Sequence, residues 1–274
     1  TRTFSSAASD VYKRQLLIFA IVGVLKETLP GKKYWLWFAA AFPFIAAWLL
    51  LGGLGLQPVE TSKLGGILLT IIIGVTGISF SLPIGIVLAL GRRSNMPALK
   101  TVCVLFIEFI RGVPLITLLF VASTMLTYFL PPGSTFDLLM RVLIMVTLFS
   151  SAYIAEVVRG GLQGLPPGQY EAADSLGLTY WKAHRLIILP QALKISIPGI
   201  VNTFIGLFKD TTLVLIIGMM DIVGLGRARL NDPYWLGLAG ELYLFIAIFF
   251  FICCFSMSRY SINLENKLST GRRD

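Results

Sequence analysis

Long apolar runs separated by short polar segments dominate the pattern along the chain. The runs at 34–56 and 65–90 contain no charged residue, and a helix needs roughly 20 apolar residues to cross the hydrocarbon core of a membrane. Runs of this length predict membrane-spanning helices. The predicted spans lie near residues 16–25, 34–56, 65–90, 99–130, 138–158, 196–220 and 236–258.

The composition agrees with an all-α membrane protein. Apolar residues make up 56% of the chain and charged residues 14%, whereas soluble domains carry about 25% charged residues. The formal net charge of +9 would by itself be compatible with a nucleic-acid partner. The distribution of that charge among the loops favours a different explanation.

Lysine and arginine are concentrated in alternate loops. The poor set is Lys63, Arg227 and Arg229, and the rich set is Lys26, Lys32, Lys33, Arg92, Arg93, Lys100, Arg159, Lys182, Arg185, Lys194, Arg259, Lys267, Arg272 and Arg273. The positive-inside rule places the rich set, with the C-terminal tail, in the cytoplasm. The basic excess therefore predicts topology and contact with anionic membrane lipids, and we expect no nucleic-acid partner.

The cysteines Cys103, Cys253 and Cys254 lie within or beside apolar runs, and His184 is the only histidine. No Cys-x-x-Cys or histidine-rich spacing accompanies them. We expect free thiols that pack as small hydrophobic groups, with no disulfide and no metal site.

The pattern divides the chain into a short leader, an accessory part, a core and a tail. Residues 1–15 are polar and lack an initiator methionine, and they resemble runs at the ends of assembled environmental sequences, so we interpret them as non-native. Residues 16–64 are expected to hold accessory transmembrane helices, the first of them truncated. Residues 65–260 form a five-span core with a cytoplasmic insertion at 159–195, and 261–274 form a cytoplasmic tail.

The insertion contains the segment EAADSLGLTYWKAHRLIILP at 171–190. Residues Gln169–Leu176 favour a helix, and Gly177 is well placed to end it in the left-handed region. A second short helix is expected at Tyr180–Leu189, stopped by Pro190. Two short helices joined at a glycine would form a compact knob (residues 169–189) on the cytoplasmic face.

This segment resembles the EAA loop of the permeases of ATP-binding-cassette (ABC) importers. The positions that match the pattern are Glu171, Ala172, Ala173, Gly177, Ile187, Leu189 and Pro190. The resemblance implies that the knob docks, as a coupling helix, into a groove on a separate ATP-hydrolysing subunit. The plainer alternative is an ordinary cytoplasmic helical hairpin.

The flanking segments 107–120, 152–173 and 189–218 resemble the polar amino-acid (histidine/glutamine-type) branch of these permeases. The additional spans before residue 65 resemble the M-type permease of the general L-amino-acid transport system. The resemblance implies transport of polar or broad-range L-amino acids from periplasm to cytoplasm by alternating access. The implied partners are ABC ATPase subunits, a second homologous permease in a heterodimer, a periplasmic amino-acid-binding protein and lipids of the bacterial inner membrane.

Charged residues inside predicted spans need a partner or a function because they are costly in lipid. Glu108 and Arg111 are three residues apart and can pair on one helix face, and Glu156 and Arg159 repeat that spacing. The alternatives to such local pairing are bridges between helices or a lining for the transport pathway.

A polar strip is expected on the span at 196–220, where Asn202 precedes the adjacent Lys209 and Asp210. Amino acids carry a carboxylate and an ammonium, so a binding chamber needs donors and acceptors close together. Such groups are offered by Arg111, Glu156, Asn202, Lys209 and Asp210. Polar contacts that hold neighbouring helices together are the alternative role for each of them.

No Gly-x-x-x-x-Gly-Lys-Ser/Thr motif occurs in the chain, so ATP and Mg²⁺ are expected to be used by a partner ATPase and not bound here. An ion-coupled secondary transporter or channel is the second hypothesis; it would predict inverted repeats, and none is visible. A membrane-embedded enzyme is the third, but no nucleophile–histidine or paired-carboxylate pattern is present.

Overall fold

The computed structural model describes residues 41, 45, 61–125, 128 and 137–269. Within these ranges the regular structure is helical, with one isolated bridge between Gly66 and Asp221. The leader predicted at 1–15, the accessory spans near 16–25 and 34–56, and the last residues of the tail lie outside the described residues.

In the described part of the chain, four helical segments are long and apolar enough to cross a membrane, or five if one bent pair is counted as a single span. They agree with the predicted core of five spans. The bounds are Gly66–Arg92 (α3), Leu138–Gln163 (α7), Tyr180–Ile217 (α9 to η4) and Ala239–Leu268 (α12, whose helix continues to Ser269), with the bent pair α4 (Pro97–Gly112) and α5 (Leu115–Thr124).

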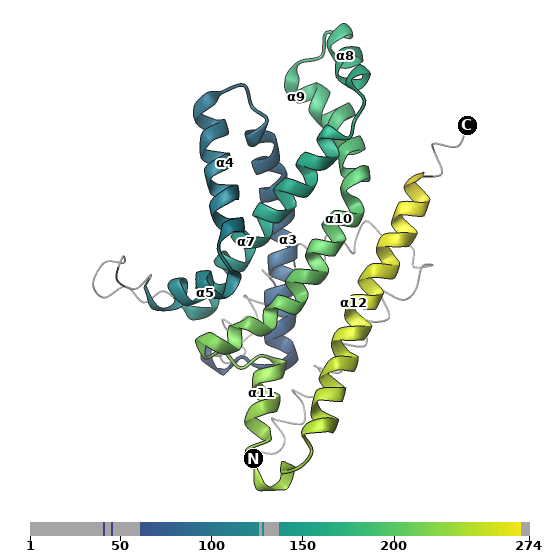
Figure 1. Cartoon of the computed structure of the whole chain (residues 1–274). Helices are drawn as coiled ribbons and strands as arrows, with labels where there is room; N and C mark the ends of the chain where they lie inside the picture. Colours follow the sequence, from purple (N-terminus) through teal and green to yellow (C-terminus); the bar gives the residue numbers. More distant parts are fainter. Residues whose placement is uncertain (1–40, 42–44, 46–60, 126–127, 129–136, 270–274) are drawn as a thin grey trace.

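The run predicted as one span at 99–130 is broken in the structure, because α4 and α5 meet at 100°. Val113 between them is extended, with φ −112° and ψ 133°. The following Pro114 disfavours helical geometry at the residue before it and cannot donate a backbone hydrogen bond. Helix α4 therefore ends at Gly112, and α5 runs across the side of the bundle (Figure 1).

Helices α3, α7 and α10 (Leu189–Asp210) pack tightly because small residues occupy their crossing points. A Cβ placed on Gly85 of α3 would lie 2.5 Å from the Ile154 side chain of α7. Gly161 of α7 leaves equally little room beside Ala192, whose carbonyl oxygen would lie 2.5 Å away. Small residues allow such close approach of helices in membranes.

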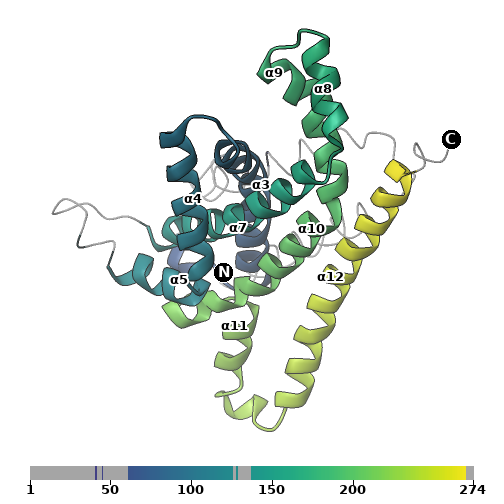
Figure 2. The same ribbon diagram turned by 45° about the horizontal axis from the view of Figure 1, so that its top comes forward.

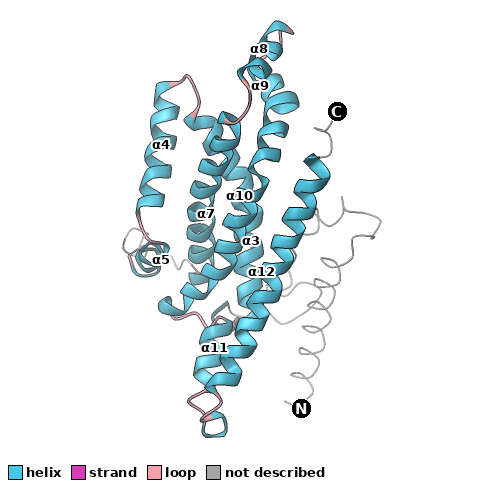
Figure 3. Cartoon of the chain, turned by 45° about the vertical axis from the view of Figure 1, so that its right-hand side comes forward, coloured by secondary structure: helices cyan, strands magenta, loops and turns pink. Residues whose placement is uncertain are grey.

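The end of the bundle away from the knob is built from short elements. Helix α10 continues as η4 (Thr211–Ile217), and a left-handed Gly218 leads to α11 (Ile222–Arg229) and η5 (Pro233–Trp235). η2 (Thr61–Lys63) precedes α3 on the same side. Figure 3 shows α11 at one end of the bundle and α8 (Pro167–Ser175) at the other, with the last turns of α12 toward the α8 end.

Candidate coupling knob and charge cluster

The knob consists of α8 (Pro167–Ser175), the turn after it, α9 (Tyr180–Ala183) and the π-helical turn η3 (His184–Ile188). It projects beyond the end of the membrane helices (Figure 2). Gly177 has a φ of +64°, and the Leu178 amide donates to the Ala173 carbonyl at 3.2 Å. The predicted helix with a left-handed glycine at its end is therefore confirmed.

The residues that match the EAA pattern divide into an open set and an inner set. Glu171, Ala172, Gly177 and Pro190 are exposed, whereas Ala173 is buried and Ile187 and Leu189 are half-buried. A Cβ on Gly177 would meet nothing within 4 Å. The open side is a surface with room for a partner, and the inner side attaches the knob to the bundle.

Apolar side chains on the outside of the knob were not among the residues predicted for docking. Leu176 and Trp181 are each 72% exposed, and Leu186 is 65% exposed. The sequence does contain a signal for such a surface, because large apolar residues in an otherwise polar loop are unusual on a soluble surface. Large apolar side chains exposed on the part of the chain that projects from the bundle favour contact with another protein.

The prediction that Pro190 stops the second helix is wrong. The helical path continues from Tyr180 through Pro190 to the end of α10. The π turn before it changes the hydrogen-bond register: the Leu189 amide bonds to the His184 carbonyl, five residues back. A helix can accommodate a proline when its backbone shifts in this way. Beside the proline, the Gln191 side-chain amide donates to the Ile187 carbonyl at 3.0 Å.

A charge cluster joins α3, α4 and α7. The Glu156 carboxylate lies 2.7 Å from an Arg92 nitrogen, 2.9 Å from Arg159 and 3.6 Å from Arg111. Arg92 also pairs with Glu108 at 2.9 Å. We call these five residues the Glu156 cluster.

The predicted pair of Glu156 and Arg159 is confirmed, but Glu108 and Arg111 do not take each other as partners. Arg92, at the end of α3, reaches Glu108 on α4, and Arg111 reaches Glu156 on α7. The reason is that the α3–α4 hairpin places an additional guanidinium beside both carboxylates. The cluster contains three guanidinium groups and two carboxylates, so positive charge is in excess.

The structure separates the other predicted pathway residues from this cluster. Asn202 lines a groove of about 220 Å³ between α10 and α12, together with Ser258 and Glu265. Lys209 is exposed and Asp210 half-buried at the end of α10. Among the described residues no ion pair or hydrogen bond joins Asn202, Lys209 or Asp210 to the Glu156 cluster. The expectation that these residues line one chamber with the cluster stays a prediction.

Residues 81–270 match the family model of the binding-protein-dependent transport system inner membrane component. The matched part includes the second half of α3 from Ser81 on, the knob and the Glu156 cluster. The chain belongs to this family of ABC importer permeases. Its members are permease subunits and not enzymes, and they are multi-pass proteins of the inner membrane.

Two relatives with assigned names are amino-acid transport permeases. The chain is 59% identical to the glutamate/glutamine/aspartate/asparagine transport system permease protein BztC of Rhodobacter capsulatus, over 86% of this chain and 55% of that protein. It is 53% identical to the inner membrane amino-acid ABC transporter permease protein YhdY of Escherichia coli, over 93% of this chain and 70% of that protein. The chain thus spans little more than half the length of the first relative.

The fold agrees with solved importers. A crystal structure of an amino acid ABC transporter with histidines superimposes with a TM-score of 0.64 at 30% identity, covering 74% of this chain and 92% of that chain. The MetNI methionine transporter in an inward-facing conformation superimposes with a TM-score of 0.55 at 18% identity, covering 86% of this chain and 99% of that chain. This likeness supports the fold alone.

Proposed function

We propose that this permease carries amino acids from the periplasm to the cytoplasm by alternating access, powered by a separate ATPase. The knob is the observation that carries the proposal, because it offers an exposed apolar surface at one end of a bundle of apolar helices. ATP and Mg²⁺ are used by the ATPase that docks there. ATP shifts the permease between its two states only if the docked knob differs in position between them.

Within the knob, we assign docking to the open set and positioning to the inner set of residues. The docking residues are Glu171, Ala172 and Gly177, and the positioning residues are Ala173, Ile187 and Leu189. Pro190 is exposed like the open set, but it lies where the knob joins α10, and we assign it to positioning as well. Small side chains at 172 and 177 allow the backbone to approach a partner closely. Leu176 and Trp181 add apolar contact area beside them.

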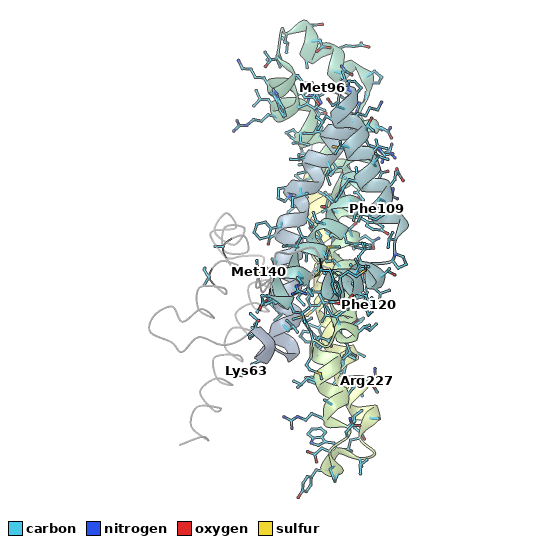
Figure 4. The ribbon with its side chains drawn as sticks, turned by 90° about the vertical axis from the view of Figure 1, so that its left-hand side faces the viewer. Lys63, Met96, Phe109, Phe120, Met140 and Arg227 are labelled. Atoms are coloured by element: carbon cyan, nitrogen blue, oxygen red, sulfur yellow. The ribbon has the colours of Figure 1, made fainter. Side chains whose placement is uncertain are left out.

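A second homologous permease, forming a heterodimer, is proposed to cover the outer face of α4 and α5. This face exposes Val102, Leu105, Phe109 and Phe120, each by more than half of its surface; Figure 4 shows Phe109 and Phe120 along one side of the molecule. Lipid would satisfy these apolar groups, but Glu108 on the same helix is 55% exposed. Glu108 pairs with Arg92, but the exposed part of its carboxylate would still be costly against lipid, which favours a protein on this face.

The substrate pathway is proposed to use Arg111 and Glu156 at the cluster and Asn202, Lys209 and Asp210 along α10. The excess positive charge of the cluster attracts a substrate carboxylate, and Asp210 or Glu156 can accept hydrogen bonds from its ammonium group. The relatives' names support amino acids, and that of the R. capsulatus protein supports acidic amino acids and their amides. The likeness to the M-type permeases stays a prediction.

The orientation is proposed from the basic residues. The knob, the α3–α4 turn and the last turns of α12 lie toward one end of the bundle (Figure 1), and this end carries most of the lysine and arginine of the described residues. The positive-inside rule makes it cytoplasmic, together with the C-terminal tail. The opposite end, with α11 and η5, then faces the periplasm and receives the amino-acid-binding protein.

The test is transport by the reconstituted complex. The permease, its partner permease and the ATPase are placed in liposomes with the binding protein, and uptake of labelled glutamate, glutamine, aspartate and asparagine is measured with and without ATP. The proposal expects ATP-dependent uptake of amino acids. Uptake that persists without ATP would favour an ion-coupled transporter, and ATP-dependent uptake of sugars or peptides alone would contradict the substrate class.

A further inference from the structure

Tyr170 connects the knob to the turn between α3 and α4. An Arg93 guanidinium nitrogen donates to the Tyr170 hydroxyl at 3.0 Å, and the guanidinium carbon lies 5.4 Å from the centre of the tyrosine ring. Arg93 directly follows the last residue of α3, and Tyr170 lies in α8. The contact thus joins two elements that are 77 residues apart in the chain.

The same hydroxyl also holds the end of α7. Tyr170 donates to the Leu162 carbonyl at 2.9 Å while it accepts from Arg93. A hydroxyl can donate one hydrogen bond and accept others, so both contacts form at once. One oxygen atom therefore ties α8 to the ends of both α3 and α7.

The Tyr170 ring extends the connection into the second half of the knob. It meets the His184 ring edge-on, with centroids 6.4 Å apart, and His184 stacks on Tyr180 at 3.9 Å. The side-chain amide of Gln191 donates to the side-chain oxygen of Gln169 at 2.8 Å, and this hydrogen bond connects the start of α8 to α10. The two helices of the knob are thus held together around Tyr170, so a force on α8 moves the knob as a unit.

Arg93 lies next to Arg92, the residue that pairs with both carboxylates of the Glu156 cluster. The two residues share one peptide bond at the helix end, and the Arg93 amide bonds back to the Leu90 carbonyl at 3.1 Å. A displacement of Arg93 therefore changes the position of Arg92. A continuous series of contacts runs from the knob through Tyr170, Arg93 and Arg92 to Glu156.

We propose that the Arg93–Tyr170 contact is a strut that transmits movement of the docked knob to the end of α3 and, through Arg92, to the Glu156 cluster. The inference rests on the proposed coupling function of the knob. Arg93 and Tyr170 are positioning residues: the strut makes the charge cluster respond to the ATPase. If the contact only stabilised the fold, its loss would lower the amount of assembled complex and leave coupling intact.

The experiment measures uptake and ATP hydrolysis in the same proteoliposomes, with the complete complex and its binding protein. The variant Tyr170→Phe removes the hydroxyl and keeps the ring against His184. We expect the amino acid taken up per ATP hydrolysed to fall roughly fivefold, the effect of losing about 1 kcal/mol of a hydrogen bond, while the yield of assembled complex stays unchanged. Arg93→Ala removes the same contact but keeps the hydrogen bond from Tyr170 to Leu162, and it should also lower the ratio.

The double variant Tyr170→Phe/Arg93→Ala tests whether the two residues act through one shared contact or affect coupling independently. If both residues act through one contact, the loss in the double variant is smaller than the product of the two single losses. Lys100→Ala is the matched control, since Lys100 is an exposed basic residue of the neighbouring α4 and should leave the ratio at the wild-type value. Wild-type coupling in Tyr170→Phe, or losses that multiply in the double variant, would overturn the strut.

A variant of the knob itself distinguishes failure of the strut from failure of the proposed function. Gly177→Leu places a large side chain on the docking surface and should lower uptake per ATP without touching Tyr170. If Gly177→Leu uncouples and Tyr170→Phe does not, the strut alone is wrong. If both variants couple normally, the docking function of the knob is wrong, and the strut is overturned with it.

Discussion

Glycine serves two different purposes in the membrane bundle and in the knob. At Gly85 and Gly161 the helices are so close that a Cβ would collide with a neighbour, although the backbone is ordinary helix. At Gly177 the surroundings are open, but the backbone has a φ of +64°. The bundle therefore uses glycine for packing, and the knob uses it for a turn on an exposed surface. Substitutions in the first region should affect stability, and those in the second should affect coupling.

The largest expected effect on stability is at Gly161. In Gly161→Ala the added methyl group would collide with the Ser196 side chain and approach the Ala192 carbonyl oxygen. Overpacking of this kind costs about 3 kcal/mol when the backbone must move. The thermal unfolding midpoint of the purified permease in detergent should fall by several degrees.

The adjacent Gly160→Ala is the matched control, because its Cβ would meet nothing within 4 Å. It should keep or raise the midpoint, since alanine favours a helix over glycine by roughly 0.5–1 kcal/mol. Equal midpoints for the two variants would contradict the packing role of the glycines in the bundle.

A smaller loss of stability is expected for Glu156→Gln. The variant keeps the shape of the side chain but leaves Arg92, Arg111 and Arg159 without their shared carboxylate. Removing one partner of a fully buried ion pair costs about 3–5 kcal/mol, and partial exposure of the arginines reduces this to about 2 kcal/mol. The same unfolding assay measures it, with Glu108→Gln as the control, since Glu108 is 55% exposed and contacts Arg92 alone among these arginines. A larger loss in Glu108→Gln would contradict the central place of Glu156.

The smallest effect on stability concerns Asp221, at the end away from the knob. Its side chain caps α11 by accepting from the Gly224 amide at 2.8 Å and is fully buried. Burial raises the pKa of this carboxyl above the ordinary 3.8, while hydrogen bonds from backbone amides oppose the rise. A raised folded-state pKa means that the folded protein binds the proton more tightly than the unfolded chain.

Stability from Asp221 should therefore be complete below pH 3.8 and be lost as the pH rises through the folded-state pKa. We expect the unfolding midpoint of the wild type to fall by a few degrees over this range. Asp221→Asn keeps a capping oxygen and cannot ionise, so the difference between the two proteins should vanish at the acid end. If the difference in unfolding midpoint between the wild type and Asp221→Asn grew toward acid pH, the raised folded-state pKa of Asp221 would be contradicted.

Local features of the fold were predictable from the sequence, and long-range ones were not. The spans follow from the length of the apolar runs, and the turn at Gly177 follows from the capping preference of glycine, because both depend on neighbouring residues only. The bend at Pro114 and the continuation through Pro190 depend on how the backbone accommodates a proline, which residue type alone does not determine.

The same distinction applies to the site. The pair Glu156–Arg159 lies within one helix and was predictable from its spacing. Arg92 joins the cluster only because the α3–α4 hairpin folds back against α7, and no spacing in the sequence indicates this. The contact between Arg93 and Tyr170 belongs to the same class.

The central claim is that the knob around Gly177 couples the permease to its ATPase. The most direct measurement compares amino acid uptake per ATP hydrolysed for wild type, Gly177→Asn and Gly177→Leu in the reconstituted complex. Asparagine tolerates the left-handed backbone and should retain most coupling, whereas leucine obstructs the docking surface and should reduce the ratio at least tenfold with the bundle still folded. Wild-type coupling in Gly177→Leu would contradict the account.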